Sequence, residues 1–164
     1  MTEVAEDLST LKKAETQEDL YLTFCLGNEN YGIEIFYVIE IVGMQRITEL
    51  PDMPCYIKGV VNLRGHIIPV MDVRLRFNMP ERPYDDRTCL IVTRIAETTT
   101  GLVVDRVNEV SQIQDGQIEA APLRHRDDQA QFIRGLGKVG DEVKILLDIQ
   151  QLLGESSPTE DEEA

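Results

Sequence analysis

A β-hairpin pattern over residues 58–72, KGVVNLRGHIIPVMD, limits the possible folds of this chain more than any other stretch. Two runs of apolar, β-favouring residues flank Arg64 and Gly65, which supply a hairpin tip tolerant of positive φ. Pro69 in the returning run has no N–H to donate to a ladder, so we expect its strand at a sheet edge or with a bulge at that point. Asp72 then fits the N-cap of a short helical turn.

The same pattern returns later in the chain, which indicates an internal repeat. Three pairs of segments correspond at offsets of 69 or 76 residues: 32–35 with 101–104, 38–41 with 107–110, and 59–72 with 135–148. Identity within the pairs is sparse, so chance similarity between β-rich segments is the alternative. Three segments in the same order nevertheless favour two similar units. Several short strands with frequent turns predict a small barrel for each unit, and units of this size are expected to share an interface.

The repeat suggests a division of the 164 residues into two barrels and two tails. We expect a first barrel at residues 20–83, completed by residues 148–153, and a second barrel at residues 84–147. The tails, residues 1–19 and 154–164, lack a strong apolar period and are rich in acids, so we expect them to be disordered.

Composition excludes several classes of protein. The net charge of −14 divides into −4 and −5 on the tails and −5 on the body, and an acidic body is repelled by a phosphate backbone, so we expect no binding to nucleic acid. The three cysteines are widely spaced and odd in number, which favours a reducing cytosol over a disulfide framework. No leader pattern opens the chain and no apolar run approaches the ~20 residues of a membrane span, so we expect a soluble, cytoplasmic protein.

Motifs for catalysis and cofactors are weak. Residues 135–140 match G-x-G-x-x-G, but a dinucleotide site needs a helix after it, and residues 143–147 are strand-like, so we interpret the glycines as turn residues of a hairpin. His66, His125 and the cysteines show no paired spacing for a metal. No nucleophile with a base, and no acid–base pair, can be singled out from the sequence, although such partners can meet in space. We expect no enzyme activity, cofactor or metal.

Arg64 is the residue of the hairpin that the repeat does not explain. Its counterpart is Gly140, so hairpin folding alone does not demand an arginine. We hypothesise that Arg64 and Glu40 adjoin and orient each other within a protein-binding face edged by Val38 and Gly59. The alternative is two unrelated exposed residues, or a surface ion pair that contributes ~0–1 kcal/mol.

Several stretches together resemble the CheW family of bacterial chemotaxis coupling proteins. The resemblance covers residues 20–153 in the family's order and rests on four stretches: YGIEIFYVIEIVG, GVVNLRGHIIPVMDVR, LVVDRVNEV and GLGKVGDEVKILLDIQQLL. It implies an all-β fold of two five-stranded barrels similar to SH3 domains, packed together, with short helical segments. Cys25 and Cys89 stand where other β-forming residues would serve, and both tails lie outside the resemblance.

The resemblance also implies a function. Proteins of this family are adaptors that bridge the cytoplasmic tip of a membrane chemoreceptor to the regulatory domain of the histidine kinase CheA, without catalysis, cofactor or insertion into the membrane. This chain would be a monomer when isolated and arrayed in the complex, recruited from the cytoplasm to membrane-bound receptor arrays. The second barrel would contact a further kinase copy. The family's receptor-binding positions fall on Val38, Glu40, Gly59, Arg64, Gly65 and Val110, and its kinase-facing surface lies near Ile41, Arg46 and Lys58.

Two other classes remain open on the residues alone. A small barrel of this kind could be a ligand-binding or regulatory subunit of an enzyme complex, which a ligand-dependent rise in melting temperature would reveal. It could also be a self-assembling structural protein, which sedimentation of the purified chain would reveal.

Overall fold

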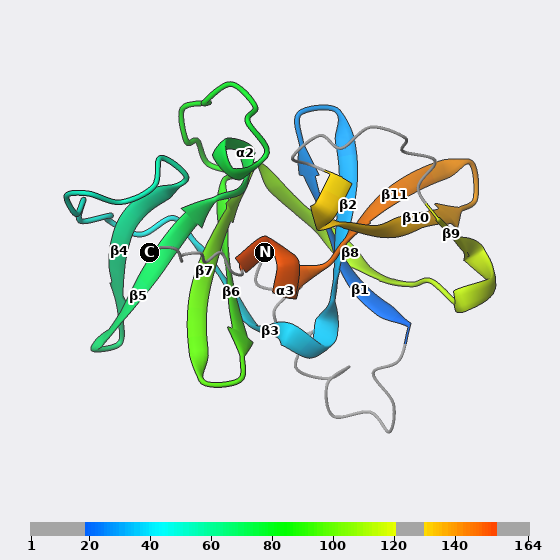
Figure 1. Ribbon diagram of the computed structural model, residues 1–164, viewed down its shortest axis with the longest axis horizontal. Coiled ribbons are helices and arrows are strands. Elements are labelled where there is room, and N and C mark those ends of the chain that lie inside the picture. The colour runs from blue at the N-terminus through cyan, green and yellow to red at the C-terminus, as the bar shows by residue number, and fades with distance from the viewer. Residues whose placement is uncertain (1–18, 121–129, 154–164) are drawn as a thin grey trace.

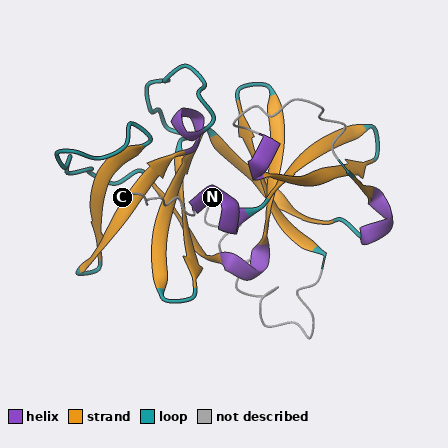
Figure 2. Ribbon diagram, viewed as in Figure 1, coloured by secondary structure: helices purple, strands orange, loops and turns teal. Residues whose placement is uncertain are grey.

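The computed structural model describes residues 19–120 and 130–153, and these form two curled β-sheets with short helical turns (Figures 1 and 2). Both tails predicted to be disordered lie almost entirely outside the described residues. The first half of the chain contains β1 (Leu20–Leu26), β2 (Glu29–Glu34), η1 (Ile35–Tyr37), β3 (Val38–Gly43), β4 (Ile57–Leu63), β5 (His66–Asp72) and α2 (Val73–Arg76). The second half contains β6 (Cys89–Ile95), β7 (Thr98–Val104), β8 (Arg106–Gln112), η2 (Asp115–Gln117), β9 (Ile118–Glu119), η3 (Ala130–Phe132), β10 (Ile133–Val139), β11 (Glu142–Leu147) and α3 (Ile149–Leu153).

The two sheets exchange their first hairpins. The five-stranded sheet has the order β3-β6-β7-β5-β4, and the six-stranded sheet has the order β8-β1-β2-β11-β10-β9. The β1–β2 hairpin therefore completes the barrel of the second half, and the β6–β7 hairpin completes the barrel of the first half. This strand order differs from the expected division into consecutive barrels at residues 20–83 and 84–147. The reason is that an apolar pattern shows which strands are buried but not which strand each one pairs with.

The internal repeat is confirmed by the registers of the two sheets. The parallel pair of β5 with β7 places Val70 opposite Gly101, and the parallel pair of β11 with β2 places Leu146 opposite Gly32. The predicted offsets relate these two pairs to each other residue for residue. A register shift between residues 57 and 59 of β4 also recurs between residues 133 and 135 of β10. Each barrel therefore repeats the other down to the position of this irregularity.

A single hydrophobic cluster joins the two barrels. Its centre is a chain of rings in which Phe24, Tyr31, Phe77 and Phe132 follow one another, each 5.7 Å from the next between ring centroids. The rings come from β1, β2, the end of α2 and η3, and the buried side of α3 belongs to the same cluster. Because apolar burial stabilises by about 25 cal/mol per Å², this shared core resists separation of the barrels.

Two local expectations need correction. Strand β5 lies inside the sheet, and its pairing with β4 has no register shift at Pro69, so neither an edge strand nor a bulge accommodates the proline; instead, the pairing with β7 begins only at Val70, one residue after it. Gly135 and Gly137 lie in β10, where the side chains of Ile118 and Ile113 pack against them, so only Gly140 of this motif is a turn residue, with φ of +62°. As expected, strand β11 follows the motif in place of a helix. None of the helices among residues 19–120 and 130–153 has the length and apolar character to cross a membrane.

Candidate protein-docking site

The tip of the β4–β5 hairpin holds Arg64 in an unfavourable backbone conformation. Arg64 has φ of +51° and Gly65 has φ of +88°, as in the primed two-residue turns that suit twisted hairpins. The Gly65 N–H donates to Oδ1 of Asn62 at 2.8 Å, which fixes the turn. A side chain in the left-handed region costs about 1–2 kcal/mol, and the equivalent position of the other hairpin is Gly140 at φ of +62°. The turn would therefore accept glycine in place of Arg64.

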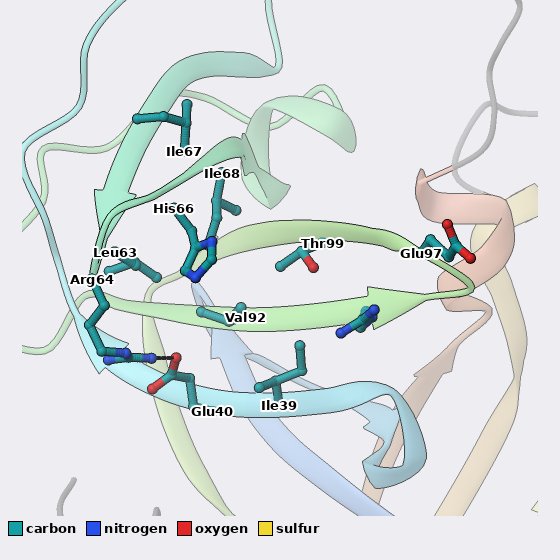
Figure 3. A pocket seen from close by; sticks show the side chains of 11 residues that line it. Ile39, Glu40, Leu63, Arg64, His66, Ile67, Ile68, Val92, Glu97 and Thr99 are labelled. Carbon is teal, nitrogen blue, oxygen red and sulfur yellow. Dashed lines mark hydrogen bonds and ion pairs between the residues drawn. The ribbon is translucent and has the colours of Figure 1, made fainter.

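Arg64 and Glu40 form an ion pair, which confirms the hypothesis that they adjoin (Figure 3). Nη2 of Arg64 donates to Oε2 of Glu40. The Arg64 side chain is 67% exposed and that of Glu40 is 27% exposed, so one partner projects into solvent while the other is held against the sheet. Strands β3 and β4 stand at opposite ends of the strand order, and the pair therefore spans the two edges of the curled sheet.

A groove of about 400 Å³ extends from this ion pair across the five-stranded barrel (Figure 3). Its lining comes from β3, the β4–β5 hairpin and the β6–β7 hairpin: Ile39, Glu40, Leu63, Arg64, His66, Ile67, Ile68, Val92, Arg94, Glu97 and Thr99. Ile67 is 63% exposed and Ile39 is 42% exposed, which is unusual for isoleucines in strands. Exposed apolar side chains beside a charged rim are typical of a protein-docking surface.

The apolar lining was not predicted from the sequence. Strict alternation over residues 38–42 would place Ile39 on the same face as Ile41, but β3 carries a register shift between Val38 and Glu40. This bulge leaves Val38 and Ile41 buried and turns Ile39 outward. The adjacent pair Ile67 and Ile68 did contain a usable pattern, because consecutive strand residues face opposite sides and one of two neighbouring isoleucines must point away from the core.

The expected receptor-binding residues divide into those at the groove and those at the core between the barrels or beneath the surface. Glu40 and Arg64 line the groove, and Gly65 is exposed beside Arg64 in the hairpin turn, so a partner could touch all three. Val38 is fully buried in the cluster between the barrels, and Val110 of β8, in the other sheet, packs half-buried against the same cluster.

Gly59 has a structural reason to be glycine. It is buried at φ of +147°, and a Cβ at this position would overlap the carbonyl oxygen of Thr48. The chain must pass this close because Thr48 and Val60 exchange backbone hydrogen bonds of 2.8 and 2.9 Å. Gly135 is the repeat equivalent of Gly59, and a Cβ on it would lie 3.1 Å from the carbonyl oxygen of Glu119 in β9. The glycine therefore serves the barrel in both halves of the chain.

The expected kinase-facing residues lie on different parts of the first barrel. Ile41 is 7% exposed in β3, whereas Arg46 is exposed in the connection between β3 and β4. Lys58 is half-buried, and its Nζ lies 2.6 Å from Oε2 of Glu81. This hydrogen bond is the main cause that raises the pKa of Lys58, so the lysine is charged and already paired.

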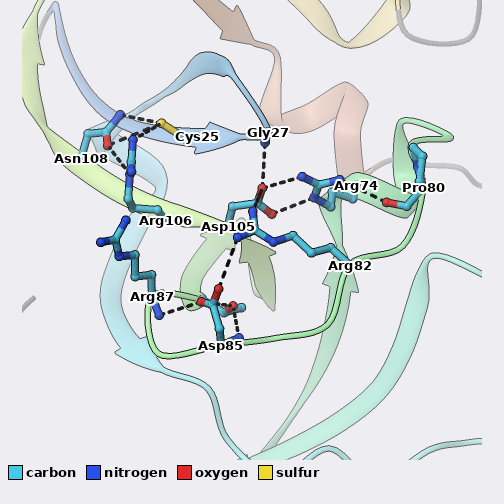
Figure 4. Close-up of polar contacts among 11 residues, drawn as sticks. Cys25, Gly27, Arg74, Pro80, Arg82, Asp85, Arg87, Asp105, Arg106 and Asn108 are labelled. Atoms are coloured by element: carbon cyan, nitrogen blue, oxygen red, sulfur yellow. Dashed lines mark hydrogen bonds and ion pairs between the residues drawn. The ribbon is translucent and has the colours of Figure 1, made fainter.

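A separate polar cluster holds the two barrels in register (Figure 4). Asp105, on the connection from β7 to β8, accepts hydrogen bonds from Nε and Nη2 of Arg74 at 2.8 and 2.7 Å and from the Gly27 N–H at 2.7 Å. Nη1 of Arg82 lies 2.9 Å from the same carboxylate. Burial raises the pKa of Asp105, but the bonds from Arg74 and Gly27 and the two arginine charges outweigh burial and lower it. The cluster is internally satisfied, which fits a structural role.

Side chains that could hold a metal ion do not gather in the part of the chain that the structure describes. Within residues 19–120 and 130–153, no group of three or more His, Cys, Asp or Glu side chains could hold a metal ion. Cys25 and Cys89 are buried, Cys55 is exposed, and His66 lines the groove. His125 lies outside the described residues. The features that the described residues do concentrate are an exposed ion pair and an apolar groove, which make this face of the first barrel a candidate protein-docking surface.

Comparison with known proteins gives the family. A CheW-like domain model matches residues 20–157. The chemotaxis protein CheW of Klebsiella aerogenes is 40% identical over 148 residues, which is 89% of each chain, and that of Bacillus subtilis is 31% identical over 136 residues, or 83% of this chain and 87% of the relative. The crystal structure of the scaffolding protein TtCheW from Thermoanaerobacter tengcongensis superimposes with a TM-score of 0.75 at 36% identity, covering 82% of this chain and 91% of that one.

These findings agree with the resemblance of the sequence and with the two barrels. The chain belongs to the CheW-like family, and the solved structure TtCheW, to which it is similar, is described as a scaffolding protein.

Proposed function

We propose that this chain is a non-catalytic adaptor that couples the cytoplasmic tips of chemoreceptors to the histidine kinase CheA. Membership of the CheW-like family supports this role, and one observation points to the residues that bind the receptor. Arg64 occupies a left-handed position where the other barrel has glycine, and it points its exposed guanidinium at Glu40 beside an apolar groove. A residue that opposes the local conformational preference and does not serve the fold is best explained by binding.

In this proposal the receptor tip binds at Glu40, Arg64 and Gly65. Val38, Gly59 and Val110 act mainly from beneath the surface, because the first two are buried and the third packs against the core between the barrels. Substitutions at these three positions would alter binding by shifting the strands that carry the exposed residues.

The kinase regulatory domain binds near Ile41, Arg46 and Lys58 on the same barrel, and the second barrel reaches a further kinase copy. Arg46 is the exposed member of this set. The protein works in the cytoplasm, as a monomer when isolated, and is recruited to receptor arrays by these contacts.

An adaptor of this kind contributes geometry and not chemistry. The shared core makes the two barrels one body, so the separation between a bound receptor and a bound kinase is fixed. Coupling is then the difference in affinity between kinase-on and kinase-off arrangements. Each interface is expected to be small, near or below about 1,200 Å², with avidity in the array compensating for moderate affinity.

Reversing one charge tests the receptor site. Arg64→Glu places a carboxylate beside Glu40, so binding of a receptor-tip fragment should be lost while the melting temperature stays nearly unchanged, because the pair is largely exposed. The measurements are a pull-down with the receptor-tip fragment and the kinase regulatory domain, and thermal unfolding of the full chain.

A matched control lies on the other barrel. Arg134 and Glu34 form a comparable exposed ion pair, with side chains 41% and 35% exposed, so Arg134→Glu makes the same change of charge away from the groove and should retain receptor binding. A collapse of the melting temperature in Arg64→Glu would show that the arginine is structural. A wild-type chain that binds neither partner would refute the adaptor function.

A further inference from the structure

The groove opens where the ladder between β5 and β7 stops. Strand β5 pairs with β4 from His66 onward, but its parallel pairing with β7 covers only residues 70–72 opposite 101–103. Pro69 stands at the first position beyond this ladder, opposite Val60 of β4. A proline has no N–H for a ladder, so the pairing cannot continue past it toward the hairpin tip.

In the second barrel the corresponding ladder is displaced toward the hairpin tip and includes the position equivalent to Pro69. Ile145 of β11 is the repeat equivalent of Pro69, and it pairs with Tyr31 of β2. This ladder covers residues 144–146 opposite 30–32, so it has the same length as that of the first barrel and lies two residues nearer the hairpin tip. At the position where Ile145 pairs with β2, the first barrel has a proline that lacks the amide N–H.

The groove lies on the side where this ladder is missing. His66, Ile67 and Ile68 line it from the part of β5 that pairs with β4 but not with β7, and Thr99 lines it from β7 (Figure 3). Thr99 is the repeat equivalent of Asn30, the residue paired with Lys144 in the other barrel. If the ladder of the first barrel ran two residues further, β5 and β7 would close over the groove.

We propose that Pro69 is a positioning residue that keeps β5 and β7 apart, and that the groove it opens receives apolar side chains of the receptor's cytoplasmic tip beside the Arg64–Glu40 pair. This rests on the proposed function. The receptor is the favoured occupant because Glu40 and Arg64 of the expected receptor site line the groove, whereas Ile41, Arg46 and Lys58 of the expected kinase surface do not.

Restoring the missing N–H tests the structural half of this inference. In ¹⁵N-labelled full-length Pro69→Ala, the new amide of residue 69 should exchange with deuterium more slowly than a free amide by about tenfold or more, because it enters the extended ladder. Pro69→Ile, which copies the second barrel, should do the same. Pro83→Ala is the matched control, since it adds an amide at an exposed loop position without a strand partner, and this amide should exchange rapidly. Rapid exchange at residue 69 in both variants would overturn the inference.

Binding tests the other half. For Pro69→Ala, the affinity for a receptor-tip fragment should fall by about tenfold. The affinity for the kinase regulatory domain should stay within about twofold, and the melting temperature should be equal or higher because one hydrogen bond is gained. A merely structural role of Pro69 would instead lower the melting temperature and weaken both partners together. Unchanged receptor affinity, or loss of kinase binding alone, would overturn the docking assignment.

The Arg64→Glu variant, measured in parallel, separates failure of this inference from failure of the proposed function. If Arg64→Glu abolishes receptor binding and Pro69→Ala with a protected amide does not, only the role of the groove is wrong. If the wild-type chain binds no receptor tip, the function and the docking assignment fall together, while the exchange measurement still decides whether Pro69 sets the end of the ladder.

Discussion

The equivalent positions at the tips of the two hairpins carry different residues, Arg64 in one barrel and Gly140 in the other. The positions of Arg64 and Gly140 both have positive φ, at +51° and +62°, and glycine is the residue that fits this region without steric cost. In Arg64 the cost remains, and it is only partly offset by an ion pair that is 67% exposed on the arginine side. Stability and binding should therefore respond in opposite ways to substitution at this tip.

Arg64→Gly should leave the free energy of unfolding unchanged or raised by up to about 1 kcal/mol, because relief of the left-handed strain exceeds the value of the exposed ion pair. The same variant should lose receptor binding. Urea unfolding and a binding assay on one preparation measure both quantities. The reciprocal change, Gly140→Arg, has open space around it and should cost about 1 kcal/mol without affecting the receptor. A large loss of stability in Arg64→Gly would show that the arginine serves the fold.

Substitution of Gly59 should lower stability, in contrast to Arg64→Gly, although both residues belong to the expected receptor-binding set. A Cβ at residue 59 would overlap the Thr48 carbonyl oxygen and lie 2.8 Å from its carbonyl carbon, so Gly59→Ala should destabilise the chain by about 2 kcal/mol or more. Gly43→Ala is the control, because nothing lies within 4 Å of its added Cβ. Equal unfolding curves for the two variants would contradict the close approach at Gly59.

The elements were predictable where a local pattern defines them. Residues 58–72 were recognised as a hairpin, and the predicted N-cap Asp72 accepts from the Leu75 N–H at 3.4 Å. Two features depend on distant partners and were not predictable: the exchange of hairpins between barrels, and the bulge in β3 that exposes Ile39. The ion pair of Arg64 could be proposed because the repeat isolated it, whereas the groove required knowing where the ladder at Pro69 ends.

The last helix, α3, depends on one residue of its repeat-equivalent helix, α2. The guanidinium of Arg76 lies 4.4 Å from the ring centroid of Tyr56 and 4.5 Å from that of Phe132, and its Nε donates to the carbonyl oxygen of Leu152 at 3.0 Å. Each desolvated cation–π contact contributes about 0.5–2 kcal/mol. Arg76 therefore joins both barrels to the end of the described chain.

Arg76→Ala should lower the free energy of unfolding by about 2–3 kcal/mol, and Arg76→Lys should recover only part of this loss because an ammonium cannot stack between two rings or keep the same bond to Leu152. Chemical denaturation measures the difference. Arg94→Ala, at an exposed position, should change stability by less than about 0.5 kcal/mol. Full recovery by lysine would mean that charge alone matters at this position.

At the scale of the whole molecule, the exchange of hairpins makes the two barrels dependent on each other. Neither barrel is complete without a hairpin from the other half of the chain, and the connections that cross between them must be held in place. Asp105 lies on one of these connections. Its carboxylate accepts hydrogen bonds from Gly27 in the turn of one exchanged hairpin, from Arg74 of α2 and from Arg82 in the segment between the halves.

Asp105→Asn should therefore destabilise the whole chain at pH 7 by about 3 kcal/mol, because Arg74, whose side chain is 13% exposed, would be left without a carboxylate. The pKa of Asp105 is lowered in the folded state, so its stabilisation is complete above the ordinary aspartate pKa of about 4 and is lost as the pH falls through the folded value. The gap in unfolding free energy between wild type and Asp105→Asn should thus be constant from pH 7 to about pH 5 and shrink below about pH 4. Glu119→Gln removes an exposed ion pair with Lys138, with side chains 61% and 58% exposed, and should cost at most about 1 kcal/mol. A gap for Asp105→Asn that stays the same down to pH 2.5 would show that this carboxylate is not the charged centre that holds the two barrels together.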